Sequence, residues 1–167
     1  MKEEKLSEIN SYLTFNLGDE EFALHVNKVL NILELAPITQ VPKAPDYMKG
    51  VINLRGMVLP VIDTRLRFGM SETVYTDKTC IVVLELMFDN NKVYVGALVD
   101  QVVAVLEIEN KQIQPPPSIG DKYKSQFISG MVNVDDKFIM ILDMEKLFTG
   151  KEILELKNKS KQKETVK

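Results

Sequence analysis

The sequence of 167 residues contains one cysteine, one histidine and no tryptophan. Cys80 has no second cysteine with which to form a disulfide, and Cys80 and His25 alone do not make a metal site. The eight glycines form neither a Gly-x-x-x-x-Gly-Lys-Ser/Thr loop nor a Gly-x-Gly-x-x-Gly fingerprint, so nucleotide binding has no motif support. With no plausible reacting group, the sequence predicts a protein that is not an enzyme and uses no metal or cofactor.

Positive charge is also in short supply. Lysine and arginine total 21 against 24 aspartates and glutamates, which gives a net charge of −3. A nucleic-acid binder needs a concentrated positive field that releases counterions from phosphate, and this composition does not supply one. Residues 151–167 form a basic tail in which six lysines face three glutamates. We therefore expect no nucleic-acid partner, with a small barrel that binds nucleic acid through this tail as an open alternative.

Long apolar runs are absent as well. No stretch approaches the ~18 apolar residues of a membrane-spanning helix, and residues 1–5 carry acids where a secretory signal would be apolar. Residues 1–9 are expected to form a polar N-terminal arm, with a short amphipathic helix around Leu6 and Ile9. We expect a cytoplasmic protein that does not insert into the membrane directly and keeps Cys80 as a buried, reduced thiol.

The chain is rich in short β-type segments. Tyr12–Leu17 and Phe22–Val26 flank a polar turn and predict a hairpin. Only short helices are expected, at Val26–Leu30, Asp63–Phe68 and Asp143–Phe148 and at the start of the tail. Many short strands at close spacing predict an all-β barrel or sandwich. The further strands are expected at Gly50–Asn53, Met57–Ile62, Cys80–Leu86, Val93–Val99, Val103–Ile108, Met131–Val134 and Phe138–Leu142.

The chain is an approximate internal duplication. At an offset of 80, residues 47–63 match residues 127–143, and at an offset of 73, residues 26–34 match residues 99–107. Each copy alone is too small to bury much apolar surface. We therefore expect two copies of one β unit to pack around a shared apolar seam.

The predicted turns at residues 53–56 and 133–136 differ between the two copies. Asn53-Leu54-Arg55-Gly56 in the first copy corresponds to Asn133-Val134-Asp135-Asp136 in the second. Aspartate pairs are ordinary turn residues, whereas arginine is enriched where proteins bind one another. Arg55 is therefore a candidate binding residue, with a solvated or locally ion-paired side chain as the alternative. The glycines in register, Gly50 and Gly130, have a mainly structural explanation, since glycine permits a close backbone approach.

The proline-punctuated segment of residues 35–42 is long and loop-like, so it is not expected to bury all of its apolar groups. Some of them are expected to form an exposed contact patch. Prolines here and at residues 115–117 are interpreted as stiffening the two equivalent connections.

The segment Lys49-Gly50-Val51-Ile52-Asn53-Leu54-Arg55-Gly56 strongly resembles the CheW family of chemotaxis coupling proteins. Supporting matches are Phe15-Asn16-Leu17-Gly18-Asp19-Glu20-Glu21-Phe22, Val58-Leu59-Pro60-Val61-Ile62-Asp63, Leu98-Val99-Asp100-Gln101-Val102 and Asp143-Met144-Glu145-Lys146-Leu147. The resemblance covers residues 10–150. It implies a single domain of two intertwined five-stranded SH3-like β-barrels, at approximately residues 10–70 and 71–150, with strand exchange as a possibility.

The resemblance also implies a function. CheW-like proteins are non-catalytic adaptors that bind the regulatory domain of the histidine kinase CheA and the cytoplasmic tip of methyl-accepting chemotaxis receptors. This chain is accordingly expected to be a monomer in isolation that is recruited to receptor arrays at the membrane. A CheV-like scaffold that binds receptors without coupling the kinase is the alternative.

Site residues follow from the positions that match the family. The receptor groove is expected at Val29, Asn31, Val102 and Val105, and the kinase contact at Leu35, Ile38 and Val41. Arg55 is expected to matter for coupling, together with its neighbours Leu54 and Gly50. The family often has an acidic residue at the position of Asn31, and the nearby Glu34 is a candidate substitute for that charge.

Overall fold

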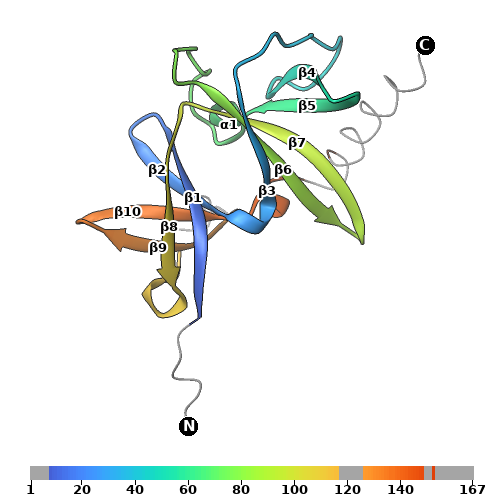
Figure 1. Ribbon diagram of the computed structural model, residues 1–167. Coiled ribbons are helices and arrows are strands. Elements are labelled where there is room, and N and C mark those ends of the chain that lie inside the picture. The colour runs from blue at the N-terminus through green and yellow to red at the C-terminus, as the bar shows by residue number, and fades with distance from the viewer. Residues whose placement is uncertain (1–7, 117–125, 149–151, 153–167) are drawn as a thin grey trace.

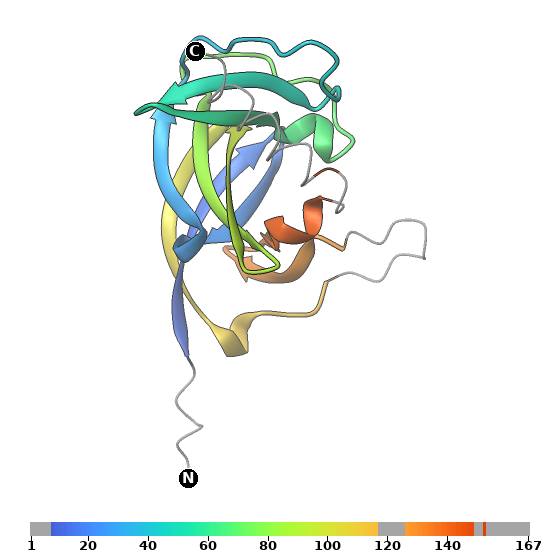
Figure 2. The same ribbon diagram turned by 90° about the vertical axis from the view of Figure 1, so that its right-hand side faces the viewer.

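The computed structural model describes residues 8–116, 126–148 and 152, which contain two small curled sheets of five strands each (Figure 1, Figure 2). The strands are β1 (Ile9–Leu17), β2 (Glu20–His25), β3 (Val29–Glu34), β4 (Met48–Leu54), β5 (Met57–Asp63), β6 (Cys80–Phe88), β7 (Asn91–Val99), β8 (Gln101–Glu109), β9 (Ile128–Val134) and β10 (Lys137–Leu142). The helices are short: α1 (Thr64–Arg67) and the 3-10 turns η2 (Val26–Lys28), η3 (Asn110–Gln112) and η5 (Met144–Leu147).

Each sheet takes strands from both halves of the chain. Barrel 1 has the order β3-β6-β7-β5-β4, and barrel 2 has the order β8-β1-β2-β10-β9. The hairpin β1–β2 thus lies among strands of the second half, while the hairpin β6–β7 lies among strands of the first half. Both hairpins join their host strands by a parallel pairing, β2 with β10 and β7 with β5. The sheets therefore do not follow a division of the sequence near residue 70.

The sequence duplication reappears as duplicated geometry. The bridge between Thr39 and Val51 beside β4 is repeated by the bridge between Gln114 and Met131 beside β9. In both halves the last strand is fixed in the same way, by a 2.7 Å backbone hydrogen bond from the amide of Asp63 to Tyr47 and from that of Asp143 to Phe127. Two five-stranded SH3-like barrels are the fold that the sequence predicted.

Aromatic side chains tie the halves together at their junction. Phe68 stacks on Phe127 with 4.6 Å between ring centroids, and Tyr47 lies 6.4 Å from Phe148. The offset of 80 relates Phe68 to Phe148 and Tyr47 to Phe127, so each ring of one copy contacts the non-equivalent ring of the other. Such aromatic pairs contribute about 0.5–1.5 kcal/mol beyond the burial of their area.

The apolar residues fill three cores. One lies inside barrel 1 around Leu59, Ile81 and Leu98, and one inside barrel 2 around Ile108 and Ile139. The third and largest is the shared seam, to which both exchanged hairpins contribute. Its fully buried members include Phe15, Leu17, Leu24, Leu84, Leu86, Val95 and Val99. Because β1, β2, β6 and β7 all contribute side chains to the shared seam, this core belongs to both halves of the chain.

Two local predictions were wrong. The segment Val26–Leu30 was expected to be helical, but only Val26–Lys28 forms a 3-10 turn and β3 begins at Val29. The expected N-terminal helix does not extend to Ile9, because β1 begins there and pairs with Glu109 of β8. Leu6, Pro117 and the predicted helix at the start of the tail lie outside the described residues.

Candidate functional site

Two strands at the edges of the sheets expose apolar side chains. On β3, Leu30 is 52% exposed and Ile32 43%, and on β8, Val103 is 45% exposed and Val105 60%. Large aliphatic groups at this exposure on neighbouring elements mark a surface that contacts something else. We call these four side chains the β3/β8 face.

Strand alternation produces this face. Successive side chains of a strand point to opposite sides, so the residues between the exposed ones point inward. Val29 and Val102 pack against the shared seam, and Leu33 packs against the core of barrel 1. The exposed side chains of β3 and β8 are thus held in place by inward side chains packed in the cores.

The predicted receptor residues divide between the two sides of these strands. Val105 lies on the exposed face, whereas Val29 and Val102 are half-buried beneath it. Asn31 is also half-buried, and its side-chain oxygen accepts a 2.8 Å hydrogen bond from the amide of Ile32. Sequence reasoning missed Leu30, Ile32 and Val103, which the alternation would have supplied had β3 been recognised as a strand.

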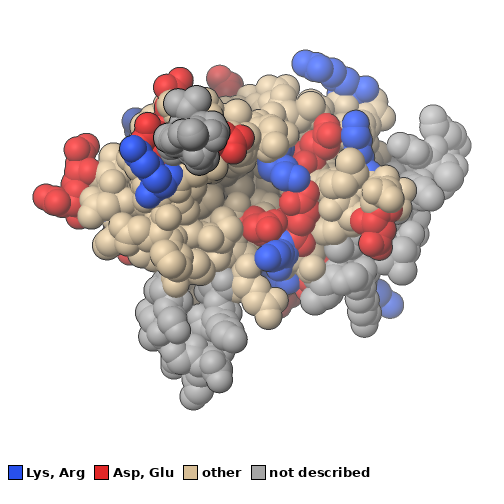
Figure 3. Space-filling view, turned by 90° about the horizontal axis from the view of Figure 1, so that it is seen from below, with Lys and Arg blue, Asp and Glu red and all other residues tan. Residues whose placement is uncertain are grey.

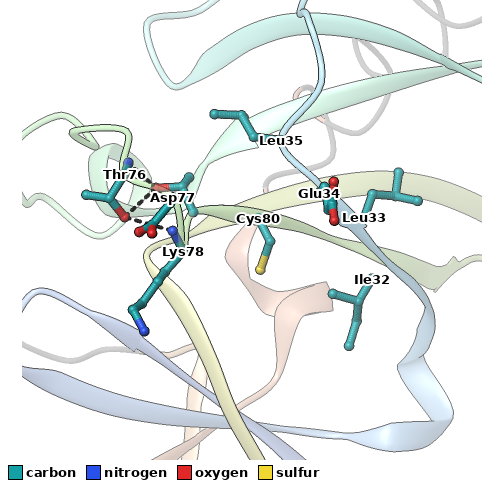
Figure 4. A pocket seen from close by; sticks show the side chains of 9 residues that line it. Ile32, Leu33, Glu34, Leu35, Thr76, Asp77, Lys78 and Cys80 are labelled. Atoms are coloured by element: carbon teal, nitrogen blue, oxygen red, sulfur yellow. Dashed lines mark hydrogen bonds between the residues drawn. The ribbon is translucent and has the colours of Figure 1, made fainter.

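Cys80 contacts both β3 and β8. Cys80 pairs with Glu34 at the end of β3, and its thiol is hydrogen-bonded to the backbone of Val102 near the start of β8. A pocket of about 490 Å³ opens here, between β3 and the segment of residues 76–80 (Figure 4). β3 and β8 run along the same side of the molecule (Figure 2), and the pocket lies at the end of β3.

Cys80 provides a test of this geometry. Burial raises the pKa of the thiol, although its hydrogen bond to the backbone opposes the shift. Because the thiolate is the nucleophile, we expect alkylation of the folded protein near pH 7 to be slower than that of a cysteine peptide. Labelling should accelerate only as the pH rises through the elevated pKa, and this burial should cost stability at alkaline pH, where the unfolded thiol ionises first. The structure leaves Cys80 half-buried rather than fully buried as the sequence predicted. Labelling as fast as the peptide at pH 7 would contradict even this partial burial of the thiol.

An ion pair fixes the start of β8. Arg65 of α1 donates to both carboxylate oxygens of Asp100, at 2.5 Å from Nη2 and 3.0 Å from Nε. The same carboxylate accepts a 2.7 Å hydrogen bond from the amide of Gly18 in the β1–β2 turn. Asp100 therefore links three elements and holds the β7–β8 corner, from which the exposed row of β8 begins. Bidentate pairs of this kind are geometrically specific as well as strong.

The β4–β5 tip carries Arg55 in an uncommon backbone conformation. Its φ is +53°, and the side-chain oxygen of Asn53 accepts a 2.8 Å hydrogen bond from the amide of Gly56 to close the turn. Arg55 is exposed and has no ion-pair partner within the part of the chain that the structure describes. Backbone conformations that cost energy occur often at functional sites. Leu54 packs inward on the core of barrel 1, which leaves the arginine as the outward group of the tip.

Gly50 lies inside the fold rather than on a surface. A β-carbon there would lie 2.1 Å from the carbonyl oxygen of Thr39, and the φ of Gly50 is +149°. Glycine at this position therefore lets the segment around Thr39 pass directly against β4.

A second apolar surface lies on barrel 1. The predicted kinase residues Leu35 and Ile38 line a pocket of about 370 Å³ together with Tyr75. The adjacent Val74 is 73% exposed and Tyr75 47%. Thr73 anchors this segment, because its hydroxyl donates a 2.8 Å hydrogen bond to the buried Asp63. We call Leu35, Ile38, Val74 and Tyr75 the barrel 1 patch. The third predicted residue, Val41, packs against the shared seam instead.

The charged residues do not form a one-sign surface. On the face seen in Figure 3, lysine and arginine side chains are interspersed with aspartates and glutamates among uncharged residues. Among the described residues, no group of histidine, cysteine, aspartate and glutamate could hold a metal ion, and no helix is long and apolar enough to cross a membrane. The β3/β8 face and the barrel 1 patch offer a partner mainly exposed apolar side chains.

The comparisons agree with this geometry. The model of the CheW-like domain matches residues 11–152. The chain belongs to the CheW-like domain family. A probable chemotaxis protein CheW of Rhizobium etli is 37% identical over 140 residues, covering 84% of this chain and 88% of the relative. A chemotaxis protein CheW of Klebsiella aerogenes is 31% identical over 150 residues, covering 90% of this chain and 88% of the relative.

A solved CheW-like structure has the same fold. The crystal structure of the scaffolding protein TtCheW from Thermoanaerobacter tengcongensis matches with a TM-score of 0.75 and 30% identity, covering 87% of this chain and 96% of TtCheW. The chemotaxis protein CheV3 of Helicobacter pylori is 27% identical, and the match covers 75% of this chain and 40% of CheV3. CheW-like proteins are scaffolds and adaptors in chemotaxis, and not enzymes. The chain is therefore a chemotaxis adaptor, and the CheV-like reading is the weaker one.

Proposed function

We propose that this chain couples methyl-accepting chemotaxis receptors to the histidine kinase CheA in the cytoplasm, at receptor arrays. The observation that carries the proposal is the presence of two exposed apolar surfaces, the β3/β8 face and the barrel 1 patch, which adjoin at Leu35, a residue that lines both pockets. An adaptor must hold two partners at once, so it needs two such surfaces on one rigid body. The shared seam provides that rigidity, because both barrels contribute to it.

The receptor is assigned to the β3/β8 face. A helical hairpin presents ridges of apolar side chains, which two rows of aliphatic groups can accept as in helix-in-groove recognition. Val105 makes direct contact in this arrangement, together with Leu30, Ile32 and Val103. Val29, Asn31 and Val102 act from beneath, by fixing the height and spacing of the two rows.

The regulatory domain of CheA is assigned to the barrel 1 patch. Leu35 and Ile38 are half-buried, so the exposed Val74 and Tyr75 offer the larger area to a partner. Val41 supports the patch from inside, because it packs against the shared seam. Coupling then requires no chemistry. A complex that favours one kinase arrangement shifts its population by the difference in binding free energy.

A calorimetric titration with the regulatory domain of CheA tests this assignment. We expect saturable binding that Val74→Asp weakens at least tenfold, because a carboxylate buried in an apolar interface is costly. Met87→Asp is the matched control, since Met87 is exposed on β6 outside both surfaces. Absence of binding by the folded wild-type protein would remove the coupling role and favour the CheV-like alternative. Equal affinities of the two variants would move the kinase surface elsewhere.

The variant Arg55→Asp is expected to change kinase coupling without changing the stability of the fold. The second tip already has aspartates at φ values of +53° and +66°, and aspartate tolerates this region better than arginine. We therefore expect a free energy of unfolding within about 0.5 kcal/mol of wild type. Receptor control of the kinase should be lost in a reconstituted array, because the outward cation has been reversed. Normal control by this variant would show that Arg55 does not contact a partner.

A further inference from the structure

We infer that the β3/β8 face selects a helical partner segment with an apolar centre and a basic residue, lysine or arginine, at each end. The acids that select these residues are Glu34 and Glu107. The inference rests on the proposed receptor site and adds to it the charge pattern of the segment that docks there.

Glu34 and Glu107 are equivalent positions of the duplication. The offset of 73 that relates Leu30 to Val103 and Ile32 to Val105 also relates Glu34 to Glu107. Both glutamates are exposed, and both continue the outward row of their strand. An exposed sequence of two aliphatic residues and one acid is thus present twice on one surface.

The two acids lie at opposite ends of the face. β3 runs upward in Figure 2 and β8 runs downward in Figure 1, and the vertical axis is the same in both views. The end of β3 with Glu34 therefore lies at the top, and the end of β8 with Glu107 lies toward the bottom. The four aliphatic side chains occupy the strand positions before each acid.

Both carboxylates are available to a partner. Neither Glu34 nor Glu107 has an ion-pair partner among the described residues, whereas Glu145 pairs with Lys28 and Glu72 with Lys49. Lys78 and Asp77 line the pocket near Glu34, but Lys78 points away from Glu34 (Figure 4). A docked segment would reduce the access of water to the two acids, which strengthens the preference for opposite charges and disfavours like ones.

The experiment measures the affinity of full-length variants for a soluble cytoplasmic fragment of a chemoreceptor at two salt concentrations. We expect Glu34→Gln and Glu107→Gln each to weaken binding about threefold at low salt, and Glu34→Lys about tenfold. The double Gln variant should also lose most of the salt dependence of the affinity, because its rim carries fewer charges. Glu20→Gln, which changes an exposed acid at the start of β2, should bind as wild type does.

The outcomes separate this inference from the proposed function. Wild-type binding that both Gln variants and Glu34→Lys retain unchanged would overturn the acidic selection and leave the receptor site standing. Failure of the wild-type protein to bind the fragment would overturn the receptor site, and the inference with it. A threefold loss from Glu20→Gln as well would assign the effect to net charge and would also overturn the inference.

Discussion

Val105→Asp is expected to weaken receptor binding about 100-fold, or ~2.8 kcal/mol, while the protein stays folded. Val105 is the most exposed member of the β3/β8 face and loses little packing in the free protein. In the complex, the new carboxylate would be desolvated against apolar side chains, which costs several kcal/mol without a partner. The measurement is the affinity for a soluble receptor fragment, with circular dichroism to verify the fold.

Val102→Ala provides a contrast within the same strand. Val102 packs against the shared seam, so its truncation should lower the free energy of unfolding by about 1–2 kcal/mol and affect receptor binding less. The rate of Cys80 alkylation is a second readout, since a docked receptor should shield the pocket at the end of the face. A Val105→Asp variant that binds normally would exclude the face as the receptor site.

Gly50→Ala is expected to lower the free energy of unfolding by about 3–5 kcal/mol, enough to unfold a marginally stable domain. The added β-carbon would lie 2.1 Å from the carbonyl oxygen of Thr39, and the backbone at φ +149° is unfavourable for any residue with a side chain. Because the obstacle is backbone, no side chain can move aside. Thermal or urea denaturation measures the effect.

Alanine substitutions at two other glycines serve as comparisons for the stability cost of Gly50→Ala. At Gly130, the equivalent position, the nearest atom to an added β-carbon is Cγ2 of Ile113 at 2.6 Å, a side-chain atom, so Gly130→Ala should cost less than Gly50→Ala. At Gly56 there is open space and only the φ of +85° opposes a side chain, so Gly56→Ala should cost about 1 kcal/mol. A Gly50→Ala variant as stable as wild type would show that the Thr39 segment does not pass against β4.

The duplication made most of the fold predictable. The matched glycines, the Asp63 and Asp143 positions and the hairpins β4–β5 and β9–β10 all recur at the offset of 80, and runs rich in valine and isoleucine bounded by turn residues identified nine of the ten strands. β3 was missed because it follows directly on a 3-10 turn, and because Val26, Val29 and Leu30, at positions i, i+3 and i+4, also fit a helical turn. The pairing of each hairpin with the other half depends on contacts distant in sequence, which local patterns do not encode.

The candidate site was predictable only in part. Family resemblance located β3 and β8, but which side of a strand faces outward depends on register, and a shift by one residue exchanges the two faces. The prediction placed Val29, Val102 and Val105 in one groove, whereas in the structure Val105 lies on the exposed side and Val29 and Val102 on the inner one. Arg55 was identifiable, because arginine is rare in this chain and replaces ordinary turn residues at a hairpin tip.

The exchange of hairpins has a consequence for synthesis of the chain on the ribosome. The hairpin β1–β2 is made before its partner strands, since Leu13 pairs with Val105 and Phe22 with Met140, so its sheet is completed only after residue 140 has been translated. Until then its apolar residues have no permanent partner, and contacts so distant in sequence form slowly. Nascent chains stalled before residue 101 are therefore expected to be open to proteases and chaperones, and the protein to become resistant in one late step.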